Sequence, residues 1–565
     1  MSKGRAGRSR GEPEFVFLPL GGAGEIGMNT YLYGFGPAND RVWIMVDLGV
    51  KFSEDHEPGI DVVLPDLSFA TSLGDRLLAI VLTHAHEDHF GAVGYLWPSL
   101  RVPVYATPFT ASLLSVRLHE RGLIEEVNLE VVPVDGRFSI GPFDLELVTV
   151  NHSIPEPQAL VIRTPAGMAV HSGDWKIDNA PVFGPRIDEI RFRELGDEGC
   201  DAFICDSTNV LREGISPTEQ EVADSLNRII RSARGRVAVT TFASHVGRIE
   251  TVAKAAEAVG RQVVVVGRAM HATIAAARNA GYLKDLPPIV DDEAFGYLPP
   301  DKVVCLCTGS QGEPRAALAR IAEDTHPTIS LEDGDLVIFS SKTIPGNEKA
   351  VIAIENNLAA RGVQVITNDE HLVHVTGHPR RGELSQMYAW LRPKLLIPMH
   401  GEKRHLLEHK LFALERGVPR AEVVCNGEIM RLAPGEPAMV GEAPVGRVYL
   451  DGQIMVPADV GLVRARRKLS FVGAVMVSLV VDRDGRLVGQ PQIALDGVPY
   501  FDGNGSEMPE IVRTAVEDVL DGVPSVRRRE SRNDALEQMI SQNVRRAVNM
   551  AWGKKPVCKV LLHRV

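Results

Sequence analysis

A dense run of polar side chains, His84-Ala85-His86-Glu87-Asp88-His89, follows the apolar stretch AIVLT and constrains this chain more than any other feature. In an extended chain alternate side chains point the same way, so His84 and His86 project to one side, and a turn into a helix brings Asp88 and His89 back toward them. Imidazoles and carboxylates at this density suit a divalent metal such as zinc or manganese, and they suffice to serve two ions. A polar surface loop with chance histidines would not explain why the donors gather directly after an apolar strand.

Three further donor residues stand at the ends of predicted strands. His152 follows LELVTVN, Asp174 ends VHSGD, and His400 ends LLIPMH. Two ions a few ångströms apart need such additional ligands, including one bridging carboxylate. Each residue taken alone is more typical of a structural role, but beside the first motif we interpret all three as metal ligands.

Composition places few limits on function. A length of 565 residues exceeds what one core usually organises, so we expect two to four domains. Hydrophobic residues make up 44% of the chain and charged residues 24%, as is typical of soluble globular proteins. The first residues lack the apolar segment of a secretory signal, and no apolar run is long enough to cross a membrane, which favours a cytoplasmic protein without membrane association. The six cysteines form no CxxC pair and are expected to be reduced and mostly buried.

The net charge of −12 is unusual for a protein that binds nucleic acid, because phosphates are normally contacted by Lys and Arg. A nucleic-acid role would therefore require a local basic groove. Each of three basic segments is a candidate, although each by itself is more typical of a solvated face or tail: Arg464, Arg466, Arg467 and Lys468; Arg527, Arg528 and Arg529; and Lys3, Arg5, Arg8 and Arg10.

The pattern of apolar residues divides the chain into blocks. From Phe15 to about Cys205, short apolar runs alternate with turns and include few convincing helices, which predicts a β-rich layered domain. After this block, strands and helices alternate, with helices near 248–258 and 269–279, as in a parallel α/β unit. A second β-rich piece, HLVHVTGH, a helical stretch and KLLIPMHGE follow. Because His400 belongs chemically with the first block, we interpret the α/β unit as an insertion.

The C-terminal part is set off by a segment rich in Pro and Gly, LAPGEPAMVGEAPVGR, which predicts a linker. Beyond it, the apolar run AVMVSLVVD and two amphipathic helical stretches, 507–520 and 534–552, predict a small α+β domain.

The donor residues resemble the metallo-β-lactamase superfamily, through Asp47 in VWIMVDLG, the HxHxDH segment, His152 and Asp174. The resemblance implies that Asp174 bridges two metal ions and that Asp47 supports the site by hydrogen bonding rather than by ligation. It also implies the two ligand sets: His84, His86, His152 and Asp174 for one ion, and Asp88, His89, Asp174 and His400 for the other. The alternative is a purely structural role, in which Asp47 is a buried carboxylate at a strand end.

The inserted unit resembles a β-CASP domain, by Asp206 in ICDSTN, His378 in VHVTGH and His400 in IPMHGE. Within that group, LGGAGEIGMN, TFASHVGRI, TGSQGEP and IPGNE are similar to ribonuclease J. The expected fold is α/β: a metallo-β-lactamase αββα sandwich with an inserted β-CASP α/β domain and a small C-terminal α+β domain. The expected boundaries are 1–13 for a flexible basic arm, 14–210 and 355–431 for the two parts of the sandwich, 211–354 for the insertion, 432–450 for the linker and 451–565 for the C-terminal domain.

This resemblance implies a metal-dependent ribonuclease that acts as a 5′-to-3′ exonuclease on single-stranded RNA, prefers 5′-monophosphate ends, has some endonuclease activity and serves RNA decay and processing. Its cofactors would be two divalent ions, zinc first and manganese as the alternative. Asp88, Asp206 and His378 would be catalytic, with His378 orienting the phosphate or protonating the leaving oxygen. A homodimer or homotetramer, and contacts with other RNA-decay proteins, are further expectations.

Preference for a 5′-monophosphate needs a pocket of hydroxyls, backbone N–H groups and imidazoles. By position in the β-CASP segments, we expect it to be formed by Ser244, His245, His374, Thr376, Gly377 and His378. Thr376 stands where the family often has Ser, and His245 and Gly247 also depart from the usual pattern, so these positions put the details of end recognition in doubt.

Other functions remain as alternatives at this point. A DNA-processing β-CASP nuclease would have a similar metal motif, whereas a catalytically silent scaffold of an RNA-decay complex would be expected to have lost ligands. A lactonase or thioesterase would require the insertion to be a lid and would leave His378 without a task. GGAGEIG is followed by a predicted strand and not by a long helix, so it does not favour a dinucleotide cofactor.

Overall fold

The structure is a computed structural model that describes residues 11–344, 346–523 and 533–565. Two of the expected basic patches, the N-terminal one and the run at 527–529, lie outside these residues. The chain forms two compact units, one of Met1–Phe52 and Val62–Val448 and the other of Ser53–Asp61 and Tyr449–Val565. The first unit carries all of the expected metal ligands.

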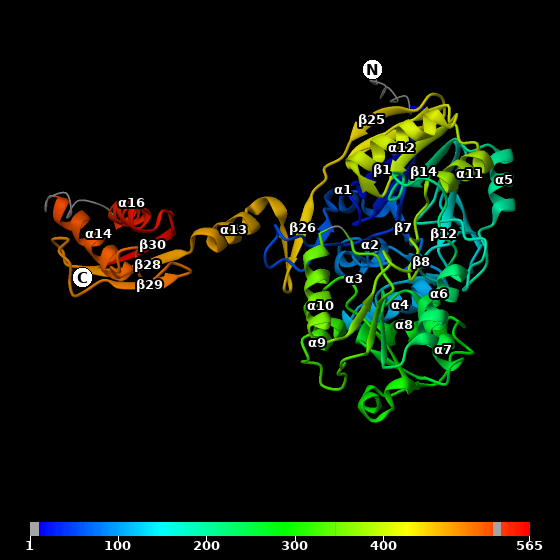
Figure 1. Cartoon of the computed structure of the whole chain (residues 1–565). Coiled ribbons are helices and arrows are strands. Elements are labelled where there is room, and N and C mark those ends of the chain that lie inside the picture. Colours follow the sequence, from blue (N-terminus) through cyan, green and yellow to red (C-terminus); the bar gives the residue numbers. More distant parts are fainter. Residues whose placement is uncertain (1–10, 345, 524–532) are drawn as a thin grey trace, which may run out of the picture. The chain divides into compact units, whose positions relative to one another are not determined.

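Two large sheets form the centre of the first unit (Figure 1). The first has the order β25-β24-β1-β3-β4-β7-β8-β9. Its strands are β1 (Glu14–Gly21), β3 (Thr30–Gly36), β4 (Val42–Val46), β7 (Leu77–Val81), β8 (Val104–Ala106), β9 (Leu129–Val131), β24 (Glu428–Ala433) and β25 (Ala438–Glu442). The second has the order β10-β11-β12-β13-β14-β21-β23. Its strands are β10 (Arg137–Ile140), β11 (Phe143–Thr149), β12 (Gln158–Thr164), β13 (Gly167–His171), β14 (Ala202–Asp206), β21 (Leu395–Met399) and β23 (Arg420–Ala421).

The two sheets pack face to face, and helices cover their outer faces. Phe17 and Tyr33 of the first sheet share a buried core with Leu160 and Ile397 of the second. The outer face of the first sheet packs against α1 (Ser68–Ser72), α2 (Glu87–Phe90), α3 (Val93–Leu96) and α4 (Pro108–Glu120). The outer face of the second packs against α5 (Glu189–Glu198), α11 (Arg381–Leu391) and α12 (Lys403–Glu415). This is the expected four-layer αββα sandwich.

A third sheet forms the inserted domain. The chain leaves the sandwich after β14 and returns to β21, which pairs with β14 in parallel, so the insertion separates two neighbouring strands. All strands of the third sheet run parallel in the order β17-β16-β18-β15-β19-β20. They are β15 (Val237–Thr240), β16 (Gln262–Val266), β17 (Ile289–Val290), β18 (Val303–Cys307), β19 (Leu336–Phe339) and β20 (Gln364–Ile366).

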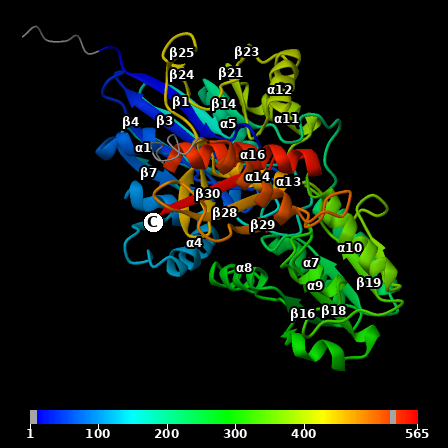
Figure 2. The same cartoon turned by 90° about the vertical axis from the view of Figure 1, so that its left-hand side faces the viewer.

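Helices cover both faces of the inserted sheet. One face packs against α6 (Glu219–Ser232), α7 (Val246–Glu257) and α8 (Arg268–Asn279), and the other against α9 (Ala317–Ala322) and α10 (Glu348–Ala360). In both views this domain, drawn in green, lies on one side of the two large sheets (Figures 1 and 2). Because the strands are parallel, the loops after β15, β18 and β19 all leave from the same edge.

Four local expectations were wrong. The first block contains the well-formed helices α4 and α5, whose mixed apolar and polar residues gave a weak periodic signal. The piece HLVHVTGH contains no strand. The expected linker includes strand β25, which pairs with β24 in the main sheet. The inserted sheet runs past residue 354, because α10 ends at Ala360 and β20 forms its edge.

The second unit is a small α+β domain with its own core. Strands β28 (Ala474–Val481), β29 (Gln492–Asp496) and β30 (Val557–Arg564) form a sheet of order β29-β28-β30, covered by α14 (Met508–Gly522) and α16 (Asn533–Trp552). Its helix α13 (Leu462–Val472) carries the remaining expected basic patch, at residues 464–468. Within this patch, Arg466 is paired with Asp451 at 2.6 Å. None of the helices described in either unit is long and apolar enough to cross a membrane. All six cysteines are free, and four of them are buried, as expected.

Candidate metal centre

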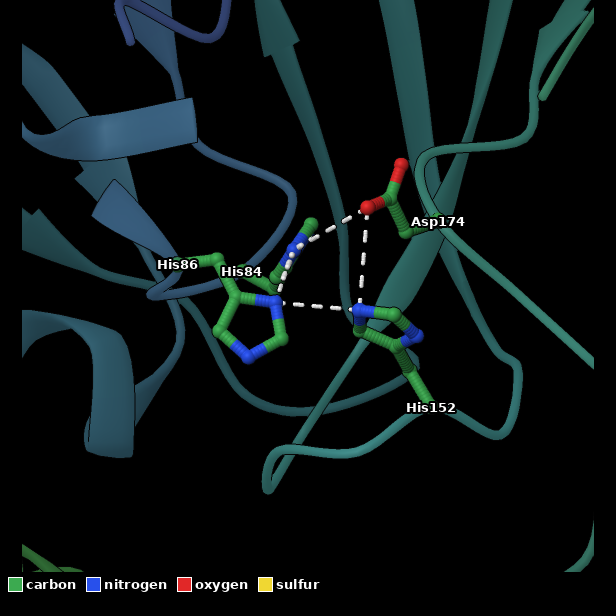
Figure 3. Close-up of side chains that lie close together, drawn as sticks. All are labelled: His84, His86, His152 and Asp174. Atoms are coloured by element: carbon green, nitrogen blue, oxygen red, sulfur yellow. Dashed lines mark hydrogen bonds and ion pairs between the residues drawn. The ribbon is translucent and has the colours of Figure 1, made fainter. Parts of the chain in front are cut away.

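The first group of donors joins three histidines and one aspartate at strand ends (Figure 3). His84 lies in the loop after β7, His86 directly precedes α2, His152 follows β11, and Asp174 follows β13. The Nδ1 atom of His86 lies 3.2 Å from Nε2 of His84 and 3.0 Å from Nε2 of His152. Asp174 Oδ2 lies 3.9 Å from His84 Nε2 and 3.6 Å from His152 Nε2.

These separations fit a single cation at the centre of the group. Four ligands about 2.0–2.1 Å from a tetrahedral zinc ion lie roughly 3.3 Å from one another. Burial lowers the pKa of His86 to about 4 and holds the pKa values of His84 and His152 well below the usual range. The three imidazoles are therefore neutral near pH 7, the form that offers a nitrogen lone pair to a metal.

A second group lies on the other side of Asp174 and comprises Asp88, His89, Asp174 and His400. His89 Nε2 is 3.3 Å from Asp174 Oδ2, and His400 Nε2 is 3.1 Å from Asp88 Oδ2. His400 Nδ1 is also 3.1 Å from Asp174 Oδ1. Asp174 thus belongs to both groups: its Oδ2 lies near His84 and His152 of the first group and its Oδ1 near His400 of the second, as a bridging carboxylate would require.

The charge of the site also calls for cations. Asp47, Asp174 and Asp206 are buried, and within the described residues their ion-pair partners are histidines, with no Lys or Arg among them. Burial opposes charge on His89, but the carboxylates of Asp174 and Asp88 outweigh it and raise its pKa to about 10. Because a cluster of buried carboxylates is stable only when compensated, the site is suited to divalent metal ions.

Asp47 contacts His89 at the ring nitrogen that faces away from the second donor group. Its carboxylate accepts hydrogen bonds from the backbone N–H and the hydroxyl of Thr83, both at 2.8 Å, and lies 2.7 Å from His89 Nδ1. Asp47 belongs to none of the donor groups. A carboxylate bonded to the second ring nitrogen holds a ligating histidine in one orientation.

Asp206 and His378 lie at the same edge as the metal ligands. His378 Nδ1 is 2.7 Å from Asp206 Oδ2 and 3.8 Å from Asp174 Oδ2. Burial lowers the pKa of His378, but Asp206 and Asp174 raise it above its usual value overall. Asp206 ends β14, and the loop that carries His378 leads into α11, so both reach the site where the insertion joins the sandwich.

The residues expected to bind the terminal phosphate fall into two places. Thr376, Gly377 and His378 lie in one loop beside the metal ligands: the Gly377 carbonyl oxygen is 2.7 Å from His152 Nδ1, and the Thr376 hydroxyl oxygen accepts from the Asn209 amide at 2.7 Å.

His245 belongs instead to a buried polar network, and His374 is buried near the charges of the same network. His245 precedes α7, where its Nδ1 accepts from the Arg248 backbone N–H, and its Nε2 lies 3.4 Å from Glu219 Oε1. Arg248, fully buried, pairs with Glu219 at 2.6 Å and donates to the Val373 carbonyl oxygen at 2.6 Å. Ser244 is the residue before His245 in the chain, and it is half-buried.

Sequence reasoning overlooked two polar residues near the ligands. Asn29 donates to Asp88 Oδ2 at 3.3 Å and lies 3.0 Å from His89 Nε2. The hydroxyl of Thr208 lies 3.2 Å from His400 Nδ1 and donates to the carbonyl oxygen of the same residue. Both stand inside segments that were already singled out, LGGAGEIGMN and ICDSTN, so their position next to motif residues was an available signal.

Comparison with known families assigns most of the chain. The metallo-beta-lactamase superfamily matches residues 24–212, the ribonuclease J beta-CASP domain residues 234–358, the Zn-dependent metallo-hydrolase RNA specificity domain residues 362–419, and the ribonuclease J C-terminal domain residues 461–565. Fold and site together therefore define a metal-dependent hydrolase of the metallo-β-lactamase superfamily with a β-CASP insertion.

Relatives of similar length name the family. The chain is 49% identical over 554 residues to ribonuclease J of Sinorhizobium meliloti, covering 98% of each chain, and 34% identical to ribonuclease J of Thermus thermophilus, covering 97% of this chain and 95% of the relative. A solved structure from Enterococcus faecalis, described as a protein of unknown function, shares the fold with a TM-score of 0.52 at 18% identity, covering 74% of this chain and 100% of its own. The chain belongs to the ribonuclease J family of metal-dependent ribonucleases.

Proposed function

We propose that this enzyme is a 5′-to-3′ exonuclease for single-stranded RNA that prefers 5′-monophosphate ends, has some endonuclease activity and serves RNA decay and processing. The observation that carries the proposal is the loop 376–378, which joins a hydroxyl, a glycine backbone and an imidazole to the metal centre. A terminal phosphate bound in this loop would place the first phosphodiester bond next to the ligands. The RNA specificity domain matched at 362–419 includes this loop.

The donor set fits two divalent ions, for which we propose zinc, with manganese as the alternative. His84, His86, His152 and Asp174 would hold one ion, and Asp88, His89, Asp174 and His400 the other. Ions bound there would act as Lewis acids toward the scissile phosphate and lower the pKa of an attacking water.

The protein's own groups then have separable tasks. Asp206 favours the protonated form of His378 through their 2.7 Å contact, so that His378 can bind a phosphate oxygen or donate a proton to the leaving oxygen. Asp88 helps to align the attacking water as well as to hold metal. Asp47 fixes the ring of His89.

The test is the degradation of end-labelled RNA bearing a 5′-monophosphate or a 5′-triphosphate, with single-stranded DNA in parallel. We expect mononucleotides released mainly from monophosphate RNA, and no release by the double variant Asp88→Ala and His89→Ala. His119→Ala, at an exposed histidine on α4, is the matched control and should retain activity. Cleavage of DNA alone would favour the DNA-processing alternative, and no cleavage in defined zinc or manganese would favour the silent scaffold.

We further propose a homodimer or homotetramer, which light scattering coupled to size-exclusion chromatography would measure. Association with other RNA-decay proteins and a cytoplasmic location stay predictions.

A further inference from the structure

Three cationic side chains from separate segments border the loop that carries His378. We call Arg212, Lys342 and Arg380 the cation cluster. Arg212 follows β14 and Asp206, and Arg380 lies two residues after His378, at the end of the same loop. The two segments run side by side, because the Arg381 backbone N–H donates to the Arg212 carbonyl oxygen at 3.0 Å.

Lys342 comes from the inserted domain. It lies in the loop after β19, at the sheet edge that faces the segment leading to His378. The Ser340 hydroxyl donates to the Val373 carbonyl oxygen at 2.6 Å, which ties the start of this loop to that segment. The Gln311 amide donates to the Lys342 carbonyl oxygen at 3.0 Å and supports the loop from the other side. The cation cluster therefore spans the junction between the sandwich and the inserted domain.

The charges of this cluster are not neutralised. Among the residues that the structure describes, Arg212, Lys342 and Arg380 have no ion-pair partner. The Arg380 guanidinium donates only to the Ile215 carbonyl oxygen, at 3.3 Å, and its buried Nε has no hydrogen-bond partner. The neighbouring Arg381 differs, since it pairs with Glu213 at 2.9 Å and also with Glu408. Burial, together with the charges of Arg212 and Arg380, lowers the pKa of Lys342.

Unpaired like charges held close together are unfavourable unless an anion joins them. The chain as a whole carries a net charge of −12, so this local excess of positive charge stands out. A phosphodiester backbone supplies anions at regular spacing, and Arg and Lys are its usual contacts.

We propose that the cation cluster binds the phosphates of single-stranded RNA beyond the nucleotide at the metal centre and so sets the affinity for long substrates. This inference rests on the proposed function. Arg212 and Lys342 are exposed and contribute mainly charge, whereas Arg380 is also the N-cap residue of helix α11.

The experiment measures the Kd of a fluorescent single-stranded RNA at several salt concentrations, in the background of Asp88→Ala and His89→Ala so that no cleavage occurs. Arg212→Gln together with Lys342→Gln should raise Kd roughly tenfold at low salt. It should also reduce the slope of log Kd against log salt by about 1.4, since each single-strand phosphate contact contributes about 0.7. With the metal ligands intact, the same pair of changes should raise KM for long RNA far more than it lowers kcat.

The matched control is Lys302→Gln. Lys302 is exposed but stands at the start of β18, at the opposite edge of the inserted sheet, so Kd and slope should match the parent. An unchanged Kd and slope in the Arg212 and Lys342 variant would overturn the inference, as would a fall in kcat at constant KM. If the wild-type enzyme degrades no RNA, the proposed function fails instead. Thermal melting checks that each variant is folded.

Discussion

The ring of His152 and the backbone of Gly377 are in direct contact. His152 Nδ1 lies 2.7 Å from the Gly377 carbonyl oxygen, and a Cβ at position 377 would lie 2.4 Å from the same nitrogen. This contact makes Nδ1 the donor and leaves Nε2, which faces His86 and Asp174, free to bind a metal. It also joins an expected metal ligand of the sandwich to the loop that follows the insertion.

Gly377→Ala should therefore displace His152 and lower kcat/KM for RNA by about 10- to 100-fold, the usual cost of disturbing a group that orients a metal ligand. The measurement is steady-state degradation of 5′-monophosphate RNA, with zinc and manganese content determined in parallel. Gly296→Ala is the matched control, because no atom lies within 4 Å of its added Cβ. Wild-type activity in Gly377→Ala would show that the contact is dispensable.

Asp47→Asn should weaken metal binding without removing a ligand. The amide cannot hold His89 Nδ1–H and the two Thr83 donors as the carboxylate does, so we expect affinity for metal to fall about 10- to 100-fold. Competition with a chelator of known affinity measures the change. Asp40→Asn, in an exposed turn, should behave as wild type, and equal affinities for all three proteins would contradict the proposed role.

Metal removal should lower thermal stability. A ligand that binds only the folded protein stabilises it, and here it would also compensate the buried carboxylate of Asp174 and the partly exposed carboxylate of Asp88. Protein from which a chelator has removed the metal should thus have a lower Tm than protein with zinc or manganese, as measured by calorimetry. The double variant Asp88→Ala and His89→Ala should respond less to the chelator; an identical shift would place the stabilising metal elsewhere.

Arg248→Ala should destabilise the first unit by about 3–5 kcal/mol, because it leaves the buried carboxylate of Glu219 without its closest cation. Urea unfolding followed by circular dichroism measures the loss. Combining Arg248→Met with Glu219→Gln removes both charges and should recover part of it. A loss no smaller in the double variant than in Arg248→Ala would argue that packing, rather than charge pairing, matters at this position.

Stability below pH 5 should depend on Glu146. Burial alone would raise its pKa, but Arg191, Arg163 and Arg137 lower it from the ordinary 4.5 to about 2. Because the folded-state pKa is depressed, the contribution is fully present above pH 4.5 and is lost as the pH falls toward 2. Glu146→Gln should be less stable at neutral pH and should lose less stability on acidification, as urea melts at several pH values would reveal. Parallel pH profiles for wild type and variant would contradict this role.

Local signals carried much of the prediction. The donors at 84–89 lie within one strand–turn–helix segment, so their convergence follows from backbone geometry alone. The helices of the insertion and of the C-terminal domain were recognisable from apolar periodicity. Periodicity did not predict helix α4, and it predicted a strand at 371–378 where there is none. In both segments the secondary structure depends on packing against other elements.

By itself, the amino-acid sequence determined the order of blocks and the family and predicted the set of metal donors, since these depend on residue type and on spacing along the chain. Only the tertiary structure decided that Asp174 lies between two donor groups, that the Gly377 carbonyl contacts His152, and that the expected phosphate residues divide between a loop beside the donor residues and a buried region around Arg248. It also brought Arg212, Lys342 and Arg380 to one junction. The physical reason is that these contacts join segments separated by the whole insertion, and no local pattern records which side chains meet when distant strands pair.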